Sequence, residues 1–419
     1  MPSRLSMSIA FLCSTAAALA QSNTSIPQAL TLQQALAFAQ RNSPPLQGAL
    51  AASERAAARV TSARAYSNPQ VEVFIGPQHA RRIATPGVPG PLQHYAAYQT
   101  VEIPEERRRR RNVAELGRQT ELYRQQGVQL SVTATVKQAF YTVIRQKEEI
   151  QHTQENLALV RDLRRRVEVE VQAGEKGRLE LTRAEAELAR ANFAVRSAQI
   201  ELSNAIAMLR VAIAAPADAN LDPQGRLEAS IKLAPLAEMR AQVLRSHPAI
   251  AEMQTVSSQS EATLEHERSR RIPQPTFFGE YERQPDLWFW RTGVIVSLPV
   301  RDRRAGPILE AQAAIRESRA AEAQRRLEIT SALERAYEQY LLADQQVTAL
   351  QSGSLHEAES AVEAAKAAYR FGERGIVEVL DAQRVLQSVR GDLLDAEFAR
   401  QTARTALEEL GAVAPEGKP

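Results

Sequence analysis

Residues 368–383 read AYRFGERGIVEVLDAQ, and a short turn in the middle of this stretch divides two helical segments. Gly372 and Gly375 bracket two charged residues, and glycine permits the left-handed backbone that ends one helix before the next begins. A turn of the same form, GEKG, carries Gly174 and Gly177. We therefore expect a sharp reversal of the chain at each of these two places.

No proline occurs in 105–215 or in 308–414, the spans that contain the two turns. Because proline breaks helix interiors, its absence over such lengths favours long helices. We expect two helical hairpins, over 105–215 and 308–411. A helix over 105–173 would be about 100 Å long at 1.5 Å per residue, which suits a rod or a tunnel wall.

Apolar residues in the first hairpin recur at intervals of three and four, the spacing of one helix face. The two predicted seams are Val128, Val132, Thr135, Ala139 and Val143, and, on the returning helix, Leu188, Ala191, Val195, Ala198 and Leu202. Small residues in a seam let helices pack closely side by side in a curved wall. A solvent-exposed coiled-coil hairpin is the alternative.

The chain repeats its motifs in the same order at an offset near 200 residues. Asn42-Ser43-Pro44 corresponds to Ser246-His247-Pro248, and the turn at Gly174 corresponds to that at Gly372. One unit, duplicated, therefore builds the protein. We expect a signal peptide over 1–20, followed by four further parts. These are a first repeat over 21–215, a linker over 216–234, a second repeat over 235–414 and a tail over 415–419.

The first 20 residues have the pattern of a secretory signal, with an apolar stretch before the cleavage motif Ala18-Leu19-Ala20. Cys13 is the only cysteine and would leave with the signal. The exported chain could then form no disulfide and offer no thiolate. A lipoprotein signal at Cys13 is the alternative, which the large Leu12 disfavours. Elsewhere no stretch approaches the roughly 20 apolar residues of a membrane helix.

Four segments rich in aromatic and β-branched residues predict strands, at about 70–76, 95–103, 276–283 and 287–298. The second pair carries Phe277, Tyr281, Trp288 and Trp290, and clustered aromatics of this kind mark the bilayer interfaces of membrane barrels. Four strands cannot close a barrel, so several chains would have to pool their strands. A small soluble sheet packed on the helices is the alternative.

Charge and composition exclude several classes of function. Lys and Arg number 52 against 49 Asp and Glu, so nothing indicates a nucleic-acid partner. The six histidines show no paired metal-ligand spacing, and no phosphate loop, dinucleotide fingerprint or serine elbow is present. We expect no enzymatic activity, no cofactor and no bound metal.

The stretch 368–383 resembles the outer membrane efflux protein family of the TolC type. The first turn, from Gly174 to Ala184, and the opening LQQAL at 32–36 with Asn42-Ser43-Pro44 are similar to the same family. The stretch before Gly306 is more similar to the heavy-metal efflux branch. The likeness covers nearly the whole mature chain.

This resemblance implies a mainly α fold with a transmembrane β part, in which three chains form an α-helical barrel and a 12-stranded β-barrel. It implies a homotrimer in the outer membrane of a Gram-negative bacterium, in contact with outer-membrane lipid and extending into the periplasm. It also implies two partners, a periplasmic adaptor (membrane fusion) protein and a proton-driven inner-membrane pump. The protein would conduct substrates passively, with heavy-metal cations as one candidate. A duct for type I protein secretion and a periplasmic coiled-coil adaptor are the alternatives.

The resemblance assigns roles to five residues near the turns. Glu378 and Asp381 correspond to the acidic ring that narrows the periplasmic entrance, where crowded carboxylates would attract cations. Tyr369, Arg374 and Glu180 correspond to the polar links that hold the entrance shut, with Arg374 to Glu180 as the main latch. Helix N-terminal carboxylates and ordinary exposed charges are the alternatives.

Basic residues follow a strand in both repeats, in the run RRRRR at 107–111 and at Arg301, Arg303 and Arg304. They are candidates for contact with anionic lipid headgroups or for lining the lumen. A solvated run of charges is the alternative.

Overall fold

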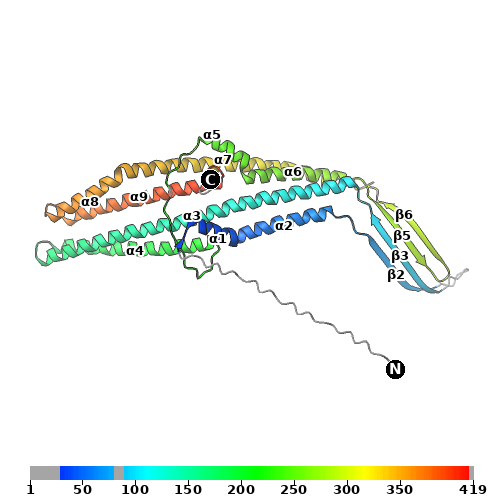
Figure 1. Ribbon diagram of the computed structural model, residues 1–419, viewed down its shortest axis with the longest axis horizontal. Helices are drawn as coiled ribbons and strands as arrows, with labels where there is room; N and C mark the ends of the chain where they lie inside the picture. Colours follow the sequence, from blue (N-terminus) through cyan, green and yellow to red (C-terminus); the bar gives the residue numbers. More distant parts are fainter. Residues whose placement is uncertain (1–28, 80–88, 228, 415–419) are drawn as a thin grey trace, which may run out of the picture.

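The computed structural model describes residues 29–79, 89–227 and 229–414. Within these ranges the chain is elongated: long helices lie side by side along most of its length, and a sheet forms one end (Figure 1). The two helical turns lie together at the opposite end. The predicted signal peptide and tail fall outside the described residues.

The same order of elements occurs twice. The first half contains α1 (Leu32–Asn42), α2 (Pro44–Arg64), β2 (Gln70–Gln78), β3 (Gly90–Thr100), α3 (Pro104–Gln172) and α4 (Arg178–Ala212). The second half contains α5 (Leu236–Ser246), α6 (Pro248–Ser269), β5 (Pro275–Arg283), β6 (Trp288–Val296), α7 (Ala305–Ala349), α8 (Leu355–Arg370) and α9 (Ile376–Glu409). The short strands β1 (Ala29–Leu30) and β4 (Asp222–Pro223) pair in parallel and tie the linker to the start of the first half.

Prolines open three of the helices. Pro44, Pro104 and Pro248 each stand in the first turn, where a helix needs no backbone N–H and the fixed φ of proline is already helical. At the start of α1, Thr31 and Gln34 form a capping box that satisfies backbone donors at both residues. The repeated motifs of the sequence are therefore helix boundaries.

Two boundaries differ from the sequence prediction. The strand expected over 95–103 is Gly90–Thr100, because β2 continues to Gln78 and pairs there with Gly90. The outgoing helix of the second hairpin is not continuous: a π-helical turn, η1 (Leu350–Ser354), separates α7 from α8. A π turn accommodates one extra residue, which no apolar spacing in the sequence indicated.

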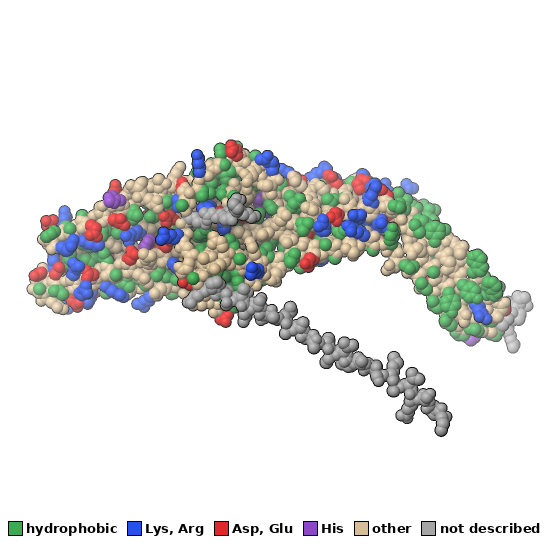
Figure 2. Space-filling model, viewed as in Figure 1, with side chains coloured by type: hydrophobic (Ala, Val, Ile, Leu, Met, Phe, Trp, Pro, Cys, Tyr) green, Lys and Arg blue, Asp and Glu red, His purple; other side chains and the backbone are tan. Residues whose placement is uncertain are grey.

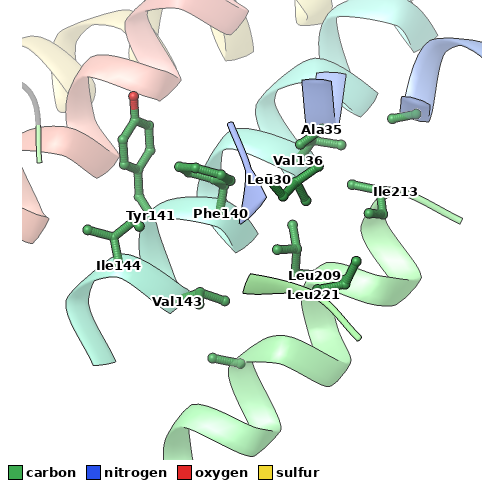
Figure 3. Packing of buried hydrophobic residues seen from close by; sticks show 12 residues of the cluster. Leu30, Ala35, Val136, Phe140, Tyr141, Val143, Ile144, Leu209, Ile213 and Leu221 are labelled. Atoms are coloured by element: carbon green, nitrogen blue, oxygen red, sulfur yellow. The ribbon is translucent and has the colours of Figure 1, made fainter. Parts of the chain in front are cut away.

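The helices form a wall one layer thick. Toward the turns, α3 packs between α4 and α9, and α9 packs against α8; toward the sheet, α3 packs between α2 and α6, and α6 against α7. Figure 3 shows one of the two main apolar clusters, where Leu30 and Ala35 meet Val136 and Phe140 of α3 and Leu209 of α4. A corresponding cluster joins α5, α7 and α9 in the second half.

The predicted seam of α4 is largely correct, since Ala191, Val195 and Ala198 are buried. That of α3 is partly correct: Val143 is buried and Val132 and Ala139 pack against the core, but Thr135 is exposed and the neighbouring Val136 and Phe140 are buried instead. The reason is that α3 has neighbours on two sides, so contacts from remote parts of the chain select its buried face.

Charged side chains are buried where the two halves meet. Lys137 Nζ of α3 lies 2.5 Å from Glu408 Oε2 of α9, and 4% and 6% of these side chains are exposed. Arg404 Nε lies 3.3 Å from the other carboxylate oxygen of Glu408. This buried network joins the first repeat to the second.

Candidate functional site

The two hairpin turns have the same backbone geometry. Gly174 and Gly372 adopt φ values of +81° and +73°, which only glycine reaches without strain. In each turn the backbone N–H three residues after the last helical residue donates back to the final turn of the helix. Glu175 donates to the carbonyl of Glu170 and Glu373 to that of Ala368, both at 2.9 Å. Gly177 and Gly375 then lead into α4 and α9.

An apolar cluster joins the two tips within one chain. Leu163 and Val167 of α3 and Ala184 of α4 pack against Tyr369 of α8 and Ile376 of α9. The first and second hairpins are thus held together close to their turns.

A hydrogen bond across this junction ties Tyr369 to the first hairpin. The Tyr369 hydroxyl donates to Glu170 Oε2 at 2.6 Å, and only 6% of Tyr369 is exposed. Burial and the Glu170 carboxylate both raise the pKa of Tyr369 well above its usual value, so the phenol stays protonated and remains a donor. The Lys176 ammonium lies 5.9 Å from the centre of the ring.

The resemblance to the efflux family predicts that Arg374 and Glu180 form the main link. Among the described residues of one chain no ion pair joins them, and Glu180 Oε2 is buried without a hydrogen-bond partner. The partner of Tyr369 is instead Glu170, which the sequence analysis missed. Glu170 stands one helical turn before Gly174, but it is one of several acidic residues in α3 with the same local pattern. A contact between Arg374 and Glu180 of a neighbouring chain stays a prediction.

Glu378 and Asp381 lie three residues apart in the first two turns of α9, and both are exposed. Their carboxylates are not equivalent. Asp381 Oδ1 accepts a hydrogen bond from Arg384 at 3.1 Å, and Arg384 also donates to Glu187 of α4 at 2.8 Å. No pattern in the sequence indicated a role for Arg384 or Glu187.

Further along the hairpins, other polar contacts join the halves. Gln383 donates to Asn156 Oδ1 at 3.2 Å, and Arg390 donates to Glu155 Oε2 at 3.2 Å. Arg390 also reaches Glu359 of α8 at 3.2 Å. The hairpins are thus joined by one apolar cluster near the turns and by a row of hydrogen bonds further along.

At the other end of the molecule, the sheet has the strand order β2-β3-β5-β6, with all neighbours antiparallel. Directly paired residues point to the same face of a sheet. Tyr95 pairs with Tyr281 and Tyr281 with Trp290, so these aromatic residues share one face. Val73, opposite Tyr95, lies on it too.

The four aromatic residues singled out in the sequence, Phe277, Tyr281, Trp288 and Trp290, all belong to this face, and each is more than a third exposed. The opposite face is more polar. It includes Glu280, which pairs with Arg291, and Glu282, whose carboxylate lies 3.5 Å from His94 Nδ1. Figure 2 shows hydrophobic side chains gathered over the sheet, whereas charges of both signs cover the helical tips.

Residues 239–412, most of the second repeat, match the outer membrane efflux protein family. The predicted resemblance is confirmed over this stretch. The chain is 25% identical to the cobalt-zinc-cadmium resistance protein CzcC of Cupriavidus metallidurans over 91% of this chain and 90% of CzcC.

Solved structures agree in fold. The outer-membrane channel OprN superposes with a TM-score of 0.79 at 19% identity, over 91% of this chain and 90% of OprN. The open state of the MtrE outer membrane channel of Neisseria gonorrhoeae superposes with a TM-score of 0.75 at 17% identity, over 91% and 88% of the two chains.

The matched family and the fold are those of channel proteins rather than of enzymes. The predicted location, in the outer membrane and extending into the periplasm of a Gram-negative bacterium, is confirmed. No helix of the described ranges combines the length and apolar character needed to cross a bilayer. Nor do those ranges hold a group of three or more His, Cys, Asp or Glu side chains placed to bind a metal ion.

The basic residues that follow a strand in each repeat are mostly engaged in internal contacts. Arg109 lies 2.6 Å from Glu265 and Arg110 lies 2.9 Å from Glu102, so both tie α3 to its surroundings. Arg304 reaches Glu267 at 2.9 Å, and Arg107 lies 3.9 Å above the ring of Tyr66. Arg301 and Arg303, by contrast, are exposed at the junction between β6 and α7.

Proposed function

We propose that three copies of this chain form a passive export duct across the outer membrane, as part of a tripartite efflux system. The observation that carries the proposal is the sheet: it has one exposed aromatic face and two edge strands. Among the described strands, β2 pairs only with β3, and β6 only with β5. An open edge is not tolerated in lipid, so these edges need partners. Three chains, each with four strands, would form a closed barrel of twelve.

The helical wall supports the same assembly. Large apolar residues are more than half exposed along its two borders: Phe193, Ile200, Met208 and Val211 on α4, and Leu309, Leu327 and Leu342 on α7. Exposed apolar rows on opposite borders are what a closed ring needs, because each border buries its row against the next chain. In that ring Phe277, Tyr281, Trp288 and Trp290 face lipid and anchor the barrel at the bilayer interface.

In the assembled duct the hairpin tips form the periplasmic entrance. Glu378 and Asp381 would contribute an acidic ring, and the bond from Tyr369 to Glu170 would hold each second hairpin against the first. Arg374 and Glu180 would add a link between neighbouring chains. A periplasmic adaptor would dock at this end and an inner-membrane pump would supply the energy, because nothing in the chain suggests an energy-converting site.

For the substrate we propose heavy-metal cations, on the likeness to a protein named for resistance to cobalt, zinc and cadmium. An acidic entrance suits cations, since carboxylates concentrate them. A duct for protein secretion is the competing use. Deleting the gene should increase sensitivity to Co²⁺, Zn²⁺ or Cd²⁺, and unchanged tolerance to all three would refute the metal substrate while leaving the duct intact.

The assembly is tested directly by purifying the protein in detergent and measuring its mass by light scattering and native mass spectrometry. A trimer that conducts ions in planar bilayers is the expected result. A monodisperse monomer, or a trimer with no conductance, would overturn the proposal.

A further inference from the structure

Three charged side chains form a bridge between the hairpins beside the predicted acidic ring. Arg384 of α9 donates through Nη2 to Glu187 Oε2 at 2.8 Å and through Nη1 to Asp381 Oδ1 at 3.1 Å. Glu187 lies on α4, in the first hairpin, and 13% of its side chain is exposed. Asp381 is 61% exposed, so Arg384 connects a nearly buried carboxylate of one hairpin to an open carboxylate of the other.

The contact changes the charge that Asp381 presents to solvent. A guanidinium at hydrogen-bond distance offsets part of the field of a carboxylate beyond a few ångströms. Glu378 has no such cation on the described surface around it: the ion pairs found on α9 begin at Asp381. The two carboxylates assigned to the ring are therefore unequal, and Glu378 carries the larger unbalanced charge.

Glu187 determines where Arg384 lies. A pair three residues apart on an exposed helix face is weak by itself, because both side chains keep other rotamers in water. The second carboxylate, on α4, gives the guanidinium two acceptors on two helices. Glu187 also takes up part of the positive charge of Arg384, which would otherwise act on Asp381 and on ions near it.

We propose that Arg384 is a specificity-determining residue of the duct: it sets how strongly the entrance prefers cations, and Glu187 is the residue that positions it. The proposal rests on the proposed function, because it requires Asp381 to line a conducting entrance. It assigns opposite effects to the two ends of one bridge. Removing Arg384 uncovers Asp381 and makes the entrance more cation-selective, whereas neutralising Glu187 leaves an extra positive charge and makes it less so.

This opposition separates a role in selectivity from a structural one. Arg384→Gln and Glu187→Gln break the same contact between hairpins, so a purely structural bridge would change the channel in the same direction in both variants. Arg384→Lys keeps the charge and should stay close to wild type in selectivity. Arg390→Gln is the matched control, because Arg390 also bridges two carboxylates, Glu155 and Glu359, but lies six residues further along α9 from the tip.

The experiment uses the full-length trimer in planar bilayers under a KCl gradient, at about 0.1 M salt to limit screening. The reversal potential reports the ratio of cation to anion permeability. A unit charge about 7 Å from a permeating ion in water acts with an energy close to RT, so the ratio should rise at least about twofold in Arg384→Gln and fall by a similar factor in Glu187→Gln. Block by hexaamminecobalt(III) should strengthen in the first variant and weaken in the second.

An unchanged ratio in Arg384→Gln, or a shift of the same sign in both variants, would overturn the proposal. An equal shift in Arg390→Gln would also overturn it, since the effect would then follow from any lost arginine on α9. If Arg384→Gln fails to assemble, the ratio of cation to anion permeability is compared between Glu187→Gln and Arg384→Lys instead. A ratio in Glu187→Gln that is not lower than in Arg384→Lys would overturn the proposal. Failure of the proposed function is distinct, because wild-type protein would then form no trimeric conducting channel.

Discussion

Tyr369→Phe removes one hydroxyl from the junction between the hairpins and leaves the packing of the ring in place. The hydroxyl donates to Glu170 at 2.6 Å from a side chain that is 6% exposed. Hydrogen bonds to charged groups contribute about 1.5–3 kcal/mol each. Glu170 remains half-buried and regains water when the donor is lost, so we expect a smaller cost, about 1 kcal/mol per chain.

In a trimer whose three entrances open together, these costs add to about 3 kcal/mol. A difference of that size shifts the balance between closed and open entrances roughly 100-fold. Because the pKa of Tyr369 is raised, its ionisation does not disturb the bond near neutral pH, and the shift should be the same across that range. The assay is single-channel recording in planar bilayers, where Tyr369→Phe should show higher conductance or longer open times than wild type.

Tyr340→Phe is the matched control. The Tyr340 hydroxyl bonds to the backbone N–H and carbonyl of Ile231 at 2.7 Å and 3.1 Å, far from the tips. This variant should lose stability without a change in conductance. Recordings of Tyr369→Phe that match wild type, from protein shown to be trimeric, would refute the role of the bond in holding the entrance.

Three further outcomes are expected. Lys137→Met should lower the free energy of unfolding in denaturant by about 3 kcal/mol, because it leaves the buried Glu408 carboxylate with one cation fewer. A loss under about 1 kcal/mol would contradict the buried pair, and so would losses in Lys137→Met and Glu408→Gln that add exactly in the double variant. Arg374→Ser should raise single-channel conductance if its guanidinium holds the neighbouring chain, and equal conductance would remove that link. A hydrogen bond from Lys147 lowers the pKa of Asp222. The contact between these two residues therefore contributes fully to docking the linker above the ordinary aspartate pKa near 4, and this contribution disappears as the pH falls through the lowered pKa of Asp222. Hydrogen exchange in 216–227 should accelerate below about pH 4, and rates that follow only the intrinsic pH dependence would argue against this anchor.

The sequence by itself determined the features that depend on local chemistry. Glycine at the two turns and proline at helix starts restrict backbone angles wherever they occur, so Gly174, Gly372 and Pro104 marked their boundaries without any knowledge of the fold. The duplicated order of motifs and the four aromatic strands followed from the same kind of evidence. With the turn at 368–383 they were sufficient to recognise the family and its place in the outer membrane.

Only the tertiary structure decided which polar groups meet. Glu170 and Glu180 have similar neighbours in the sequence, yet it is Glu170 of α3 that the fold brings to Tyr369 of α8. Arg384 has a local partner in Asp381 that helix spacing could predict, whereas its contact with Glu187 depends on how α9 lies against α4. Charged side chains carry no periodic signal of their own, and their long, flexible stems can reach several partners. Their pairing is therefore set by the packing of remote helices rather than by the residues around them.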